Sequence, residues 1–193
     1  RCPCSAESPA QPKPHGKVAP QTRRARPFSI DYPHQIKALF HVVLVEPEIP
    51  PNTGNVARLC SAARCRLHLV GPLGFKLDDT QLKRAGMDYW RFVDWRYHES
   101  IQDAMAERDA GAATYCVETS GEKLYTEVPY RRGDFLVFGR ETRGLRRTTI
   151  DKAGGTCVRI PILDSRARSL NLSNAVAVVV YEALRQNAFG MAP

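Results

Sequence analysis

The strongest constraint on the fold of this chain is the way short apolar runs alternate with helical patterns. Residues 40–45 form an apolar run interrupted only by His41, which is typical of a strand buried on both faces. Residues 53–63 follow with apolar side chains at Val56, Leu59, Cys60 and Ala63, the spacing of one helix face. This alternation predicts an α/β fold with a mostly parallel sheet flanked by helices.

The rest of the chain continues the pattern after a stiff, proline-rich segment, Glu46–Pro51, that we expect to be non-helical. The terminal helix is the clearest, because apolar residues repeat at i, i+3 and i+4 over three turns. This terminal helix spans 172–187, and further helices are expected at 80–85 and 100–108. Further strands are expected at 66–70, 91–95, 114–117, 135–138 and 157–160.

Residues 1–37 differ from the remainder in composition. They hold seven of the 14 prolines and seven basic residues against Glu7 and Asp31. Such a segment predicts a disordered, basic, proline-rich arm, followed by one folded domain over residues 38–193. The arm could be a solvated linker, an RNA-attracting tail or part of an organelle-targeting segment. A cytoplasmic protein is the first expectation, and an organellar one is the alternative.

Composition excludes several classes of protein. The longest aliphatic run, Ala175–Val180, is far shorter than the ~20 residues that cross a bilayer, so we expect a soluble protein without a membrane contact. The net charge of +8 makes a polyanionic partner plausible. The histidines and cysteines lack metal-ligand spacing, so no metal site is expected. The phosphate-binding glycine patterns of dinucleotide and P-loop proteins are also absent.

Three polar groupings remain, each after a predicted strand, where ligands of parallel sheets bind. The first spans residues 52–58, where Thr53 or Asn52 can cap the helix and Arg58 lies off its apolar stripe. The second, residues 138–145, holds three charged residues and a threonine between two glycines. The third, residues 160–174, has more hydroxyls and amides than one helix cap needs.

These three groupings resemble the three motifs of the SpoU class of RNA 2′-O-ribose methyltransferases. The resemblance rests on Asn52 with Arg58, on Gly139, Glu141 and Gly144, and on the segments Ile160–Ile162 and Ser169–Ser173. It covers residues 40–187 and is closest to the TrmL (YibK) subgroup, which methylates the ribose of the wobble nucleotide, cytidine or uridine 34, in tRNA. It implies a C-terminal deep trefoil knot, an S-adenosylmethionine site in that knot, tRNA as partner and a homodimer.

The resemblance also implies roles for individual residues. Asn52, Arg58, Glu141 and Asn171 match positions associated with catalysis, and Tyr181 matches a position on the dimer-forming helix. The chain departs from the pattern at Arg140, where a proline is expected, and in the loop between Pro161 and Ser169, which is one residue longer than expected. The positions that match the cofactor pocket are Val117, Gly139, Ile160 and Ser169.

The chemistry leaves the role of Arg58 open. A ribose 2′-hydroxyl must be aligned with the methyl donor and relieved of its proton. Arg58 is either the base, for which a guanidinium is poorly suited, or a group that orients the phosphate. Two other functions stay open, namely a SpoU-class enzyme for another tRNA or rRNA position and a catalytically silent, knotted RNA-binding dimer. Phosphate contacts are expected from the basic residues Lys83, Arg84, Arg131, Arg132, Arg140, Arg143, Arg146, Arg147, Arg166 and Arg168.

Overall fold

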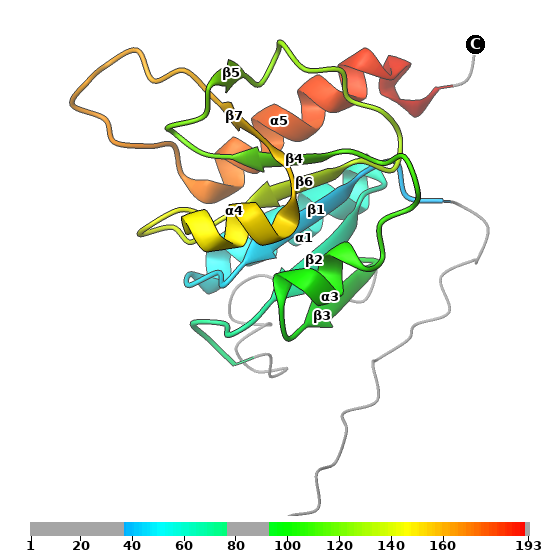
Figure 1. The fold of residues 1–193 in the computed structure, drawn as a ribbon, viewed down its shortest axis with the longest axis horizontal. Coiled ribbons are helices and arrows are strands. Elements are labelled where there is room, and N and C mark those ends of the chain that lie inside the picture. The colour runs from blue at the N-terminus through cyan, green and yellow to red at the C-terminus, as the bar shows by residue number, and fades with distance from the viewer. Residues whose placement is uncertain (1–36, 77–92, 192–193) are drawn as a thin grey trace, which may run out of the picture.

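A computed structural model describes residues 37–76 and 93–191 of the chain. Its centre is a seven-stranded sheet in the order β3-β2-β1-β6-β4-β7-β5, and every pair of neighbouring strands is parallel (Figure 1). The predicted parallel α/β fold is therefore confirmed. The strands are β1 (His41–Val45), β2 (Arg66–Val70), β3 (Trp95–His98), β4 (Thr114–Val117), β5 (Lys123–Leu124), β6 (Phe135–Phe138) and β7 (Thr156–Arg159).

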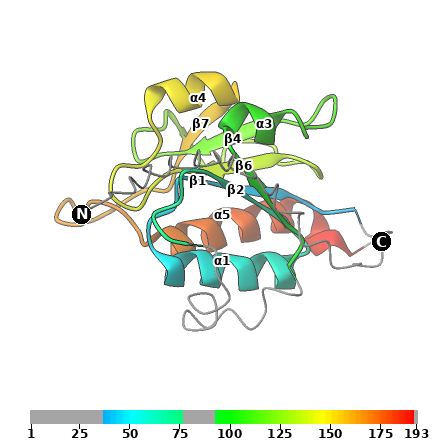
Figure 2. The same cartoon turned by 90° about the horizontal axis from the view of Figure 1, so that it is seen from below.

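Helices cover both faces of the sheet. Figure 2 shows α1 (Pro50–Ala63) and α5 (Leu172–Gln186) side by side on one face, with α3 (Ile101–Met105) and α4 (Arg147–Ala153) on the other. A short 3-10 helix, Ala188–Gly190, follows α5. Within the described ranges, no helix is long and apolar enough to cross a membrane.

The core consists of two layers that β1 separates. Val42 and Leu44 pack with buried residues of α1 and α5, whereas Val43 and Val45 belong to the cluster on the α3–α4 side. All five residues of β1 are buried, because both faces of this central strand are covered. The continuous apolar run in the sequence is the direct consequence of this double burial.

The structure corrects the predicted start of the first helix. The helix begins at Pro50, so part of the segment expected to be non-helical forms its first turn. Proline is tolerated there because its missing N–H group has no intrahelical partner in the first turn. The N-cap is Ile49, without a side-chain cap, so neither Asn52 nor Thr53 has the capping role expected of it.

Other predicted elements vary in accuracy. The strands at 66–70, 114–117 and 135–138 are confirmed to the residue. The third strand lies later than expected, at residues 95–98, while β5 and α4 were not predicted. The helix expected at 80–85 and nearly all of the N-terminal arm lie outside the described residues.

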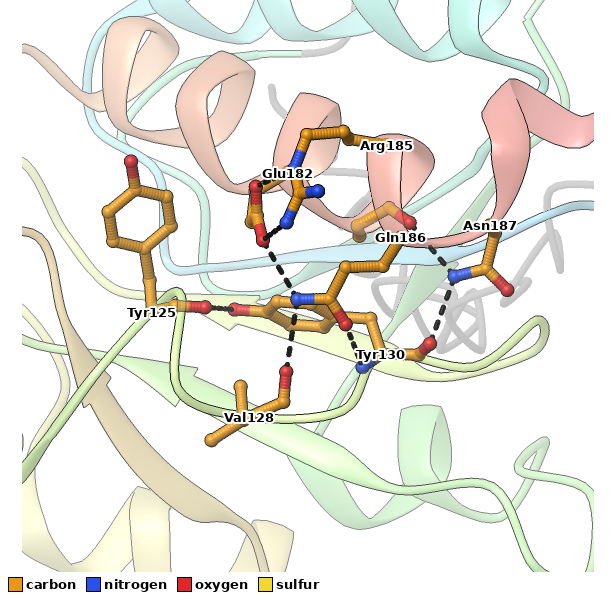
Figure 3. A network of polar contacts seen from close by, with 8 residues as sticks. Tyr125, Val128, Tyr130, Glu182, Arg185, Gln186 and Asn187 are labelled. Atoms are coloured by element: carbon orange, nitrogen blue, oxygen red, sulfur yellow. Dashed lines mark hydrogen bonds and ion pairs between the residues drawn. The ribbon is translucent and has the colours of Figure 1, made fainter.

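The connection between β4 and β6 reaches the outer side of β7. Residues 118–134 leave β4, pair with the outer side of β7 as β5, and return to β6 on the far side of β4. The carboxyl end of α5 is bound to this connection, as Figure 3 shows. Gln186 accepts from the Tyr130 backbone N–H at 3.0 Å and donates to the Val128 carbonyl at 3.2 Å. Asn187 donates to the Tyr130 carbonyl at 2.9 Å.

Candidate active site

A cavity of about 310 Å³ lies beyond the carboxyl ends of β4, β6 and β7. It is bounded by the loop 139–146 after β6 and the loop 160–171 before α5, which lie at the same end of the sheet (Figure 1). The lining residues are Val117, Glu118, Thr119, Phe138, Gly139, Arg140, Glu141, Thr142, Arg143, Gly144, Ile160, Ile162, Arg168, Ser169, Leu170, Leu172 and Ala175.

The four predicted cofactor residues meet at this cavity. Val117, Gly139, Ile160 and Ser169 all line it, although they come from three separate segments, the end of β4, the loop 139–146 and the loop 160–171. Parallel strands bring these segments together, because their carboxyl ends meet at one edge of the sheet.

Gly139 is the tightest point of the cavity wall. A Cβ atom at this position would overlap the backbone of Gly144 and Leu145, so the loop closes on itself only because a glycine stands there. The Arg140 N–H donates to the Gly144 carbonyl at 3.2 Å, and the Gly144 N–H donates back at 2.9 Å. The loop is a compact turn with a fixed shape.

Three of the predicted catalytic residues form one hydrogen-bonded chain. The Asn52 side-chain amide donates to Glu141 Oε1 at 3.0 Å, and the Asn171 amide donates to Asn52 Oδ1 at 2.9 Å. Asn171 is also the N-cap of α5, where its Oδ1 accepts from the Ser173 backbone N–H at 2.9 Å. The chain thus ties the start of α1, the 139–146 loop and the start of α5 together.

Glu141 supplies the cap that α1 lacks. Its carboxylate accepts from the backbone N–H groups of Glu48 at 2.9 Å and Ile49 at 3.2 Å. These donors precede the helix, where a negative charge is stabilised by the free N–H groups and the helix dipole. Glu141 therefore positions the first turn of α1 against the loop 139–146.

A second set of contacts joins the loop 139–146 to the segment after β1. Arg140 forms an ion pair with Glu46, and its guanidinium lies 3.9 Å from a carboxylate oxygen of Glu48. Glu48 in turn accepts from the Thr142 hydroxyl at 2.7 Å. The arginine at the position where the resemblance expects proline thus has acidic partners from the segment after β1.

Glu118 is a cavity residue that the sequence analysis missed. It follows β4 directly, lines the cavity and accepts a hydrogen bond from the Leu145 backbone N–H. Burial raises the pKa of its carboxyl above the ordinary value. A single acidic residue after a strand carries no pattern of its own, so the sequence offered no signal for it.

The rim of the cavity is basic and exposed. Arg143 and Arg168 line the cavity and are exposed, and Leu163 in the 160–171 loop is 96% exposed. Arg131, Arg132, Arg146 and Arg147 are also exposed, as the prediction of phosphate contacts requires. Lys83 and Arg84 lie outside the described residues.

Arg58 lies on the outward side of α1. Its side chain is exposed and, like Asn52 and Asn171, it is not among the residues that line the cavity. The same holds for Asn55, one turn earlier. Both positions face away from the buried side of α1, which is made of residues such as Val56 and Cys60.

The fold and the cavity define a class of α/β protein that binds a compact ligand in loops beyond a parallel sheet. The chain belongs to the SpoU rRNA methylase family, whose model matches residues 39–181. The expected family membership is confirmed.

Relatives and solved structures agree with this assignment. The chain is 49% identical over 153 residues to a tRNA (cytidine(34)-2′-O)-methyltransferase of Burkholderia pseudomallei, covering 78% of this chain and 97% of the relative. It matches a solved structure described as "Structural insights into the 2-OH methylation of C/U34 on tRNA", with a TM-score of 0.71, 44% identity, and coverage of 77% and 96% of the two chains.

A more distant solved structure holds a ligand. This is the SpoU methyltransferase AviRb from Streptomyces viridochromogenes in complex with the cofactor AdoMet. The TM-score is 0.69 and the identity 25%, with coverage of 80% of this chain and 63% of that chain.

Proposed function

We propose that this chain is a tRNA methyltransferase that modifies the 2′-hydroxyl of the wobble nucleotide, cytidine or uridine 34. The observation that carries the proposal is that two of the motifs line one cavity and the third is hydrogen-bonded to them through Asn52, in a chain nearly half identical to enzymes of that name. Residue-level roles follow from what each group contacts.

The cofactor of the proposed reaction is S-adenosylmethionine, and the cavity suits it. Its walls combine apolar side chains such as Phe138 and Ile160 with polar groups such as Glu118 and Ser169, as a purine nucleoside joined to an amino acid requires. When bound, this cofactor supplies an activated methyl group on a positively charged sulfur. Val117, Gly139, Ile160 and Ser169 would hold it, and the Glu118 carboxylate would favour its positive charge.

Asn52, Glu141 and Asn171 act by holding the reaction geometry. Their hydrogen bonds fix the loop 139–146 relative to the starts of α1 and α5. Because Asn171 stands at the start of α5, its position also fixes where the loop 160–171 ends. Pre-set loops of this kind keep a ribose hydroxyl aligned with the methyl donor.

The exposed arginines at the cavity rim are suited to bind the RNA backbone. Arg143 and Arg168 border the cavity, so phosphates next to the target nucleotide would lie beside them. Such contacts position RNA without reading its sequence, since they bind phosphate oxygens. Recognition of the particular tRNA must come from other contacts.

A homodimer would complete the site. The outer side of α5 carries the 51% exposed Tyr181 and the half-buried Ala177 and Val178, an apolar surface on the same layer as α1. Pairing through this layer would cover that surface. It would also bring Arg58, which faces outward on α1, toward the cavity of the partner copy. There Arg58 would orient the target phosphate by paired hydrogen bonds.

The topology supports the deep trefoil knot that the resemblance implies. Residues 118–134 reach the outer side of β7, and the chain that follows β7 runs on to α5, whose end is hydrogen-bonded to residues 128 and 130 of that same connection. Passage of the final segment through the loop that residues 118–134 form would give this knot. We place the reaction in the cytoplasm, with an organelle as the alternative if the N-terminal arm is a targeting segment.

The test of the function is transfer of labelled methyl from S-adenosylmethionine to total tRNA and, separately, to ribosomal RNA. The expected product is 2′-O-methylated nucleotide 34, mapped by nuclease digestion and mass spectrometry. Methylation at another RNA position would assign the chain to a different SpoU activity. Cofactor binding without transfer to either RNA would favour a catalytically silent binding protein.

A further inference from the structure

A row of three histidines crosses the sheet outside the cavity. His41, His68 and His98 stand on the neighbouring strands β1, β2 and β3, on the face that α3 and α4 cover. All three are buried. His41 Nδ1 lies 2.9 Å from His68 Nε2, and His68 Nδ1 lies 2.9 Å from His98 Nε2.

All three imidazoles are buried, and each has a nitrogen of a neighbouring histidine within hydrogen-bond distance. Neutral imidazole has one nitrogen with a free lone pair, which is the form that binds transition metals.

Glu107, just after α3, adds a carboxylate to the end of this row. One ligand atom from each of His68, His98 and Glu107 lies within 4.8 Å of the other two. Arg96 binds Glu107 Oε1 at 2.8 Å, but Glu107 Oε2 is buried without a hydrogen-bond partner. An orphan buried carboxylate oxygen is costly, and a bound ion is one of the explanations that such an atom requires.

We propose that His68, His98 and Glu107 form a zinc site that ties the edge strand β3 and the end of α3 to β2. Two histidines and one glutamate are a ligand set that zinc uses in proteins. Tetrahedral zinc holds two imidazole nitrogens about 3.4 Å apart, so a small outward movement of the rings of His68 and His98 admits the ion.

The surrounding contacts are those that a bound metal requires. With His68 Nδ1 on the metal, its Nε2–H donates to His41 Nδ1 and fixes the tautomer and ring orientation. The ion pair with Arg96 holds Glu107 in the same way. His68 and Glu107 would therefore each be held by a second residue as well as by the metal. Glu107 is about a quarter exposed, which leaves a path for the ion and for a water as fourth ligand.

The sequence gives no local signal for this site. His68 and His98 are 30 residues apart, and only the pairing of β2 with β3 brings them together. The expectation of no metal site rested on short spacings between ligands, to which a site shared by two strands and a loop does not conform.

The test measures zinc directly and needs no enzymatic activity. The full chain, with Cys2→Ser and Cys4→Ser to remove other zinc ligands, is stripped with a chelator, exposed to zinc sulfate, desalted and analysed by mass spectrometry for metal. We expect about one zinc ion per chain. Glu107→Gln should lower the zinc content about tenfold or more, whereas Glu122→Gln, an exposed control, should not change it.

Two further measurements keep the test decisive if a histidine variant fails to fold. Cobalt should give the visible absorption of a four-coordinate site in the parent chain and lose it in Glu107→Gln. His41→Asn should retain zinc with affinity weakened about 10- to 100-fold. Zinc content near zero in the parent chain, or equal content in Glu107→Gln, would overturn the proposal. Neither result would bear on methyl transfer.

Discussion

The Asn171 side-chain amide donates to Asn52 Oδ1 at 2.9 Å, although the two residues are 119 positions apart. The Asn52 amide in turn donates to Glu141, and Asn171 Oδ1 accepts from the Ser173 backbone N–H. Every donor in this chain therefore points toward Glu141. Each amide is therefore held in one orientation. The three motifs are one structural unit, and a change in any member is transmitted to the others.

This unit predicts energetic coupling between its two asparagines. Asn52→Ala and Asn171→Ala should each lower the free energy of unfolding by about 1–3 kcal/mol, because partners inside the fold lose a hydrogen bond. The double variant should lose about 0.5–1.5 kcal/mol less than the sum. Urea denaturation of the four proteins in the cycle measures this coupling, and simple additivity would show that the two residues act independently.

Gly139 should be essential for the cofactor cavity. Gly139→Ala places a Cβ against the backbone of Gly144 and Leu145, so the loop must open and cofactor affinity should fall about 100-fold, equivalent to roughly 3 kcal/mol. Calorimetric titration with S-adenosylmethionine measures the change. Gly155→Ala is the matched control, because its Cβ would lie 2.8 Å from the Thr114 carbonyl oxygen, away from the cavity. Equal loss of affinity in both variants would indicate general destabilisation.

The ion pairs of Arg140 should stabilise the contact between the loop 139–146 and the segment after β1. Arg140→Met keeps the length of the side chain but leaves Glu46 and Glu48 without this cation, so the protein should lose about 1–2 kcal/mol of stability. Arg147→Met is the control, since its ion pair with Asp151 is mostly exposed and should be worth less than about 0.5 kcal/mol. Thermal unfolding compares the two. A larger effect at Arg147 would contradict the assignment.

The buried thiols predict sensitivity to alkaline pH. Burial raises the pKa of Cys65 and Cys116 from 9.0 to about 12, so the folded chain keeps both protons where the unfolded chain loses them. The unfolded state then binds fewer protons, and stability falls as pH rises from about 9 toward 12. Each thiol contributes at most about 1.4 kcal/mol per pH unit. Urea unfolding between pH 8 and 10 should show a shallower decline in the variant Cys65→Ala/Cys116→Ala.

The sequence predicted the elements whose signal is local. β2, β4 and β6 were found to the residue, because each is a short run of mostly apolar side chains in a buried sheet. The helix α4 was missed because Ala153 is its only buried residue, which leaves no apolar stripe to detect. The two residues of β5 are too few to carry a pattern.

The features that escaped prediction depend on contacts between distant segments. The start of α1 was misjudged because its cap is Glu141, more than 90 residues away. Glu118 and the row of histidines have the same origin, since strand pairing assembles them and no spacing in the sequence records it. The motifs named the site residues, but only the structure shows that Arg58 is exposed on the outward side of α1.

The position of Arg58 leads to a prediction about two copies of the chain. Arg58→Ala alone should fold and bind S-adenosylmethionine but lose most methyl transfer, because the residue lies outside the cavity of its own chain. Gly139→Val alone should lose cofactor binding while keeping Arg58.

If Arg58 serves the partner's cavity, mixing the two inactive variants should restore activity. In a mixed dimer, the chain with Arg58→Ala offers an intact cavity, and the chain with Gly139→Val offers an intact Arg58. With random pairing, half of the dimers are mixed and each has one working site, so activity should return to about a quarter of the parent value. Unfolding and refolding the variants together, with differently tagged chains to verify mixed dimers, provides the measurement. Mixed dimers without activity would mean that Arg58 acts on its own chain or not at all.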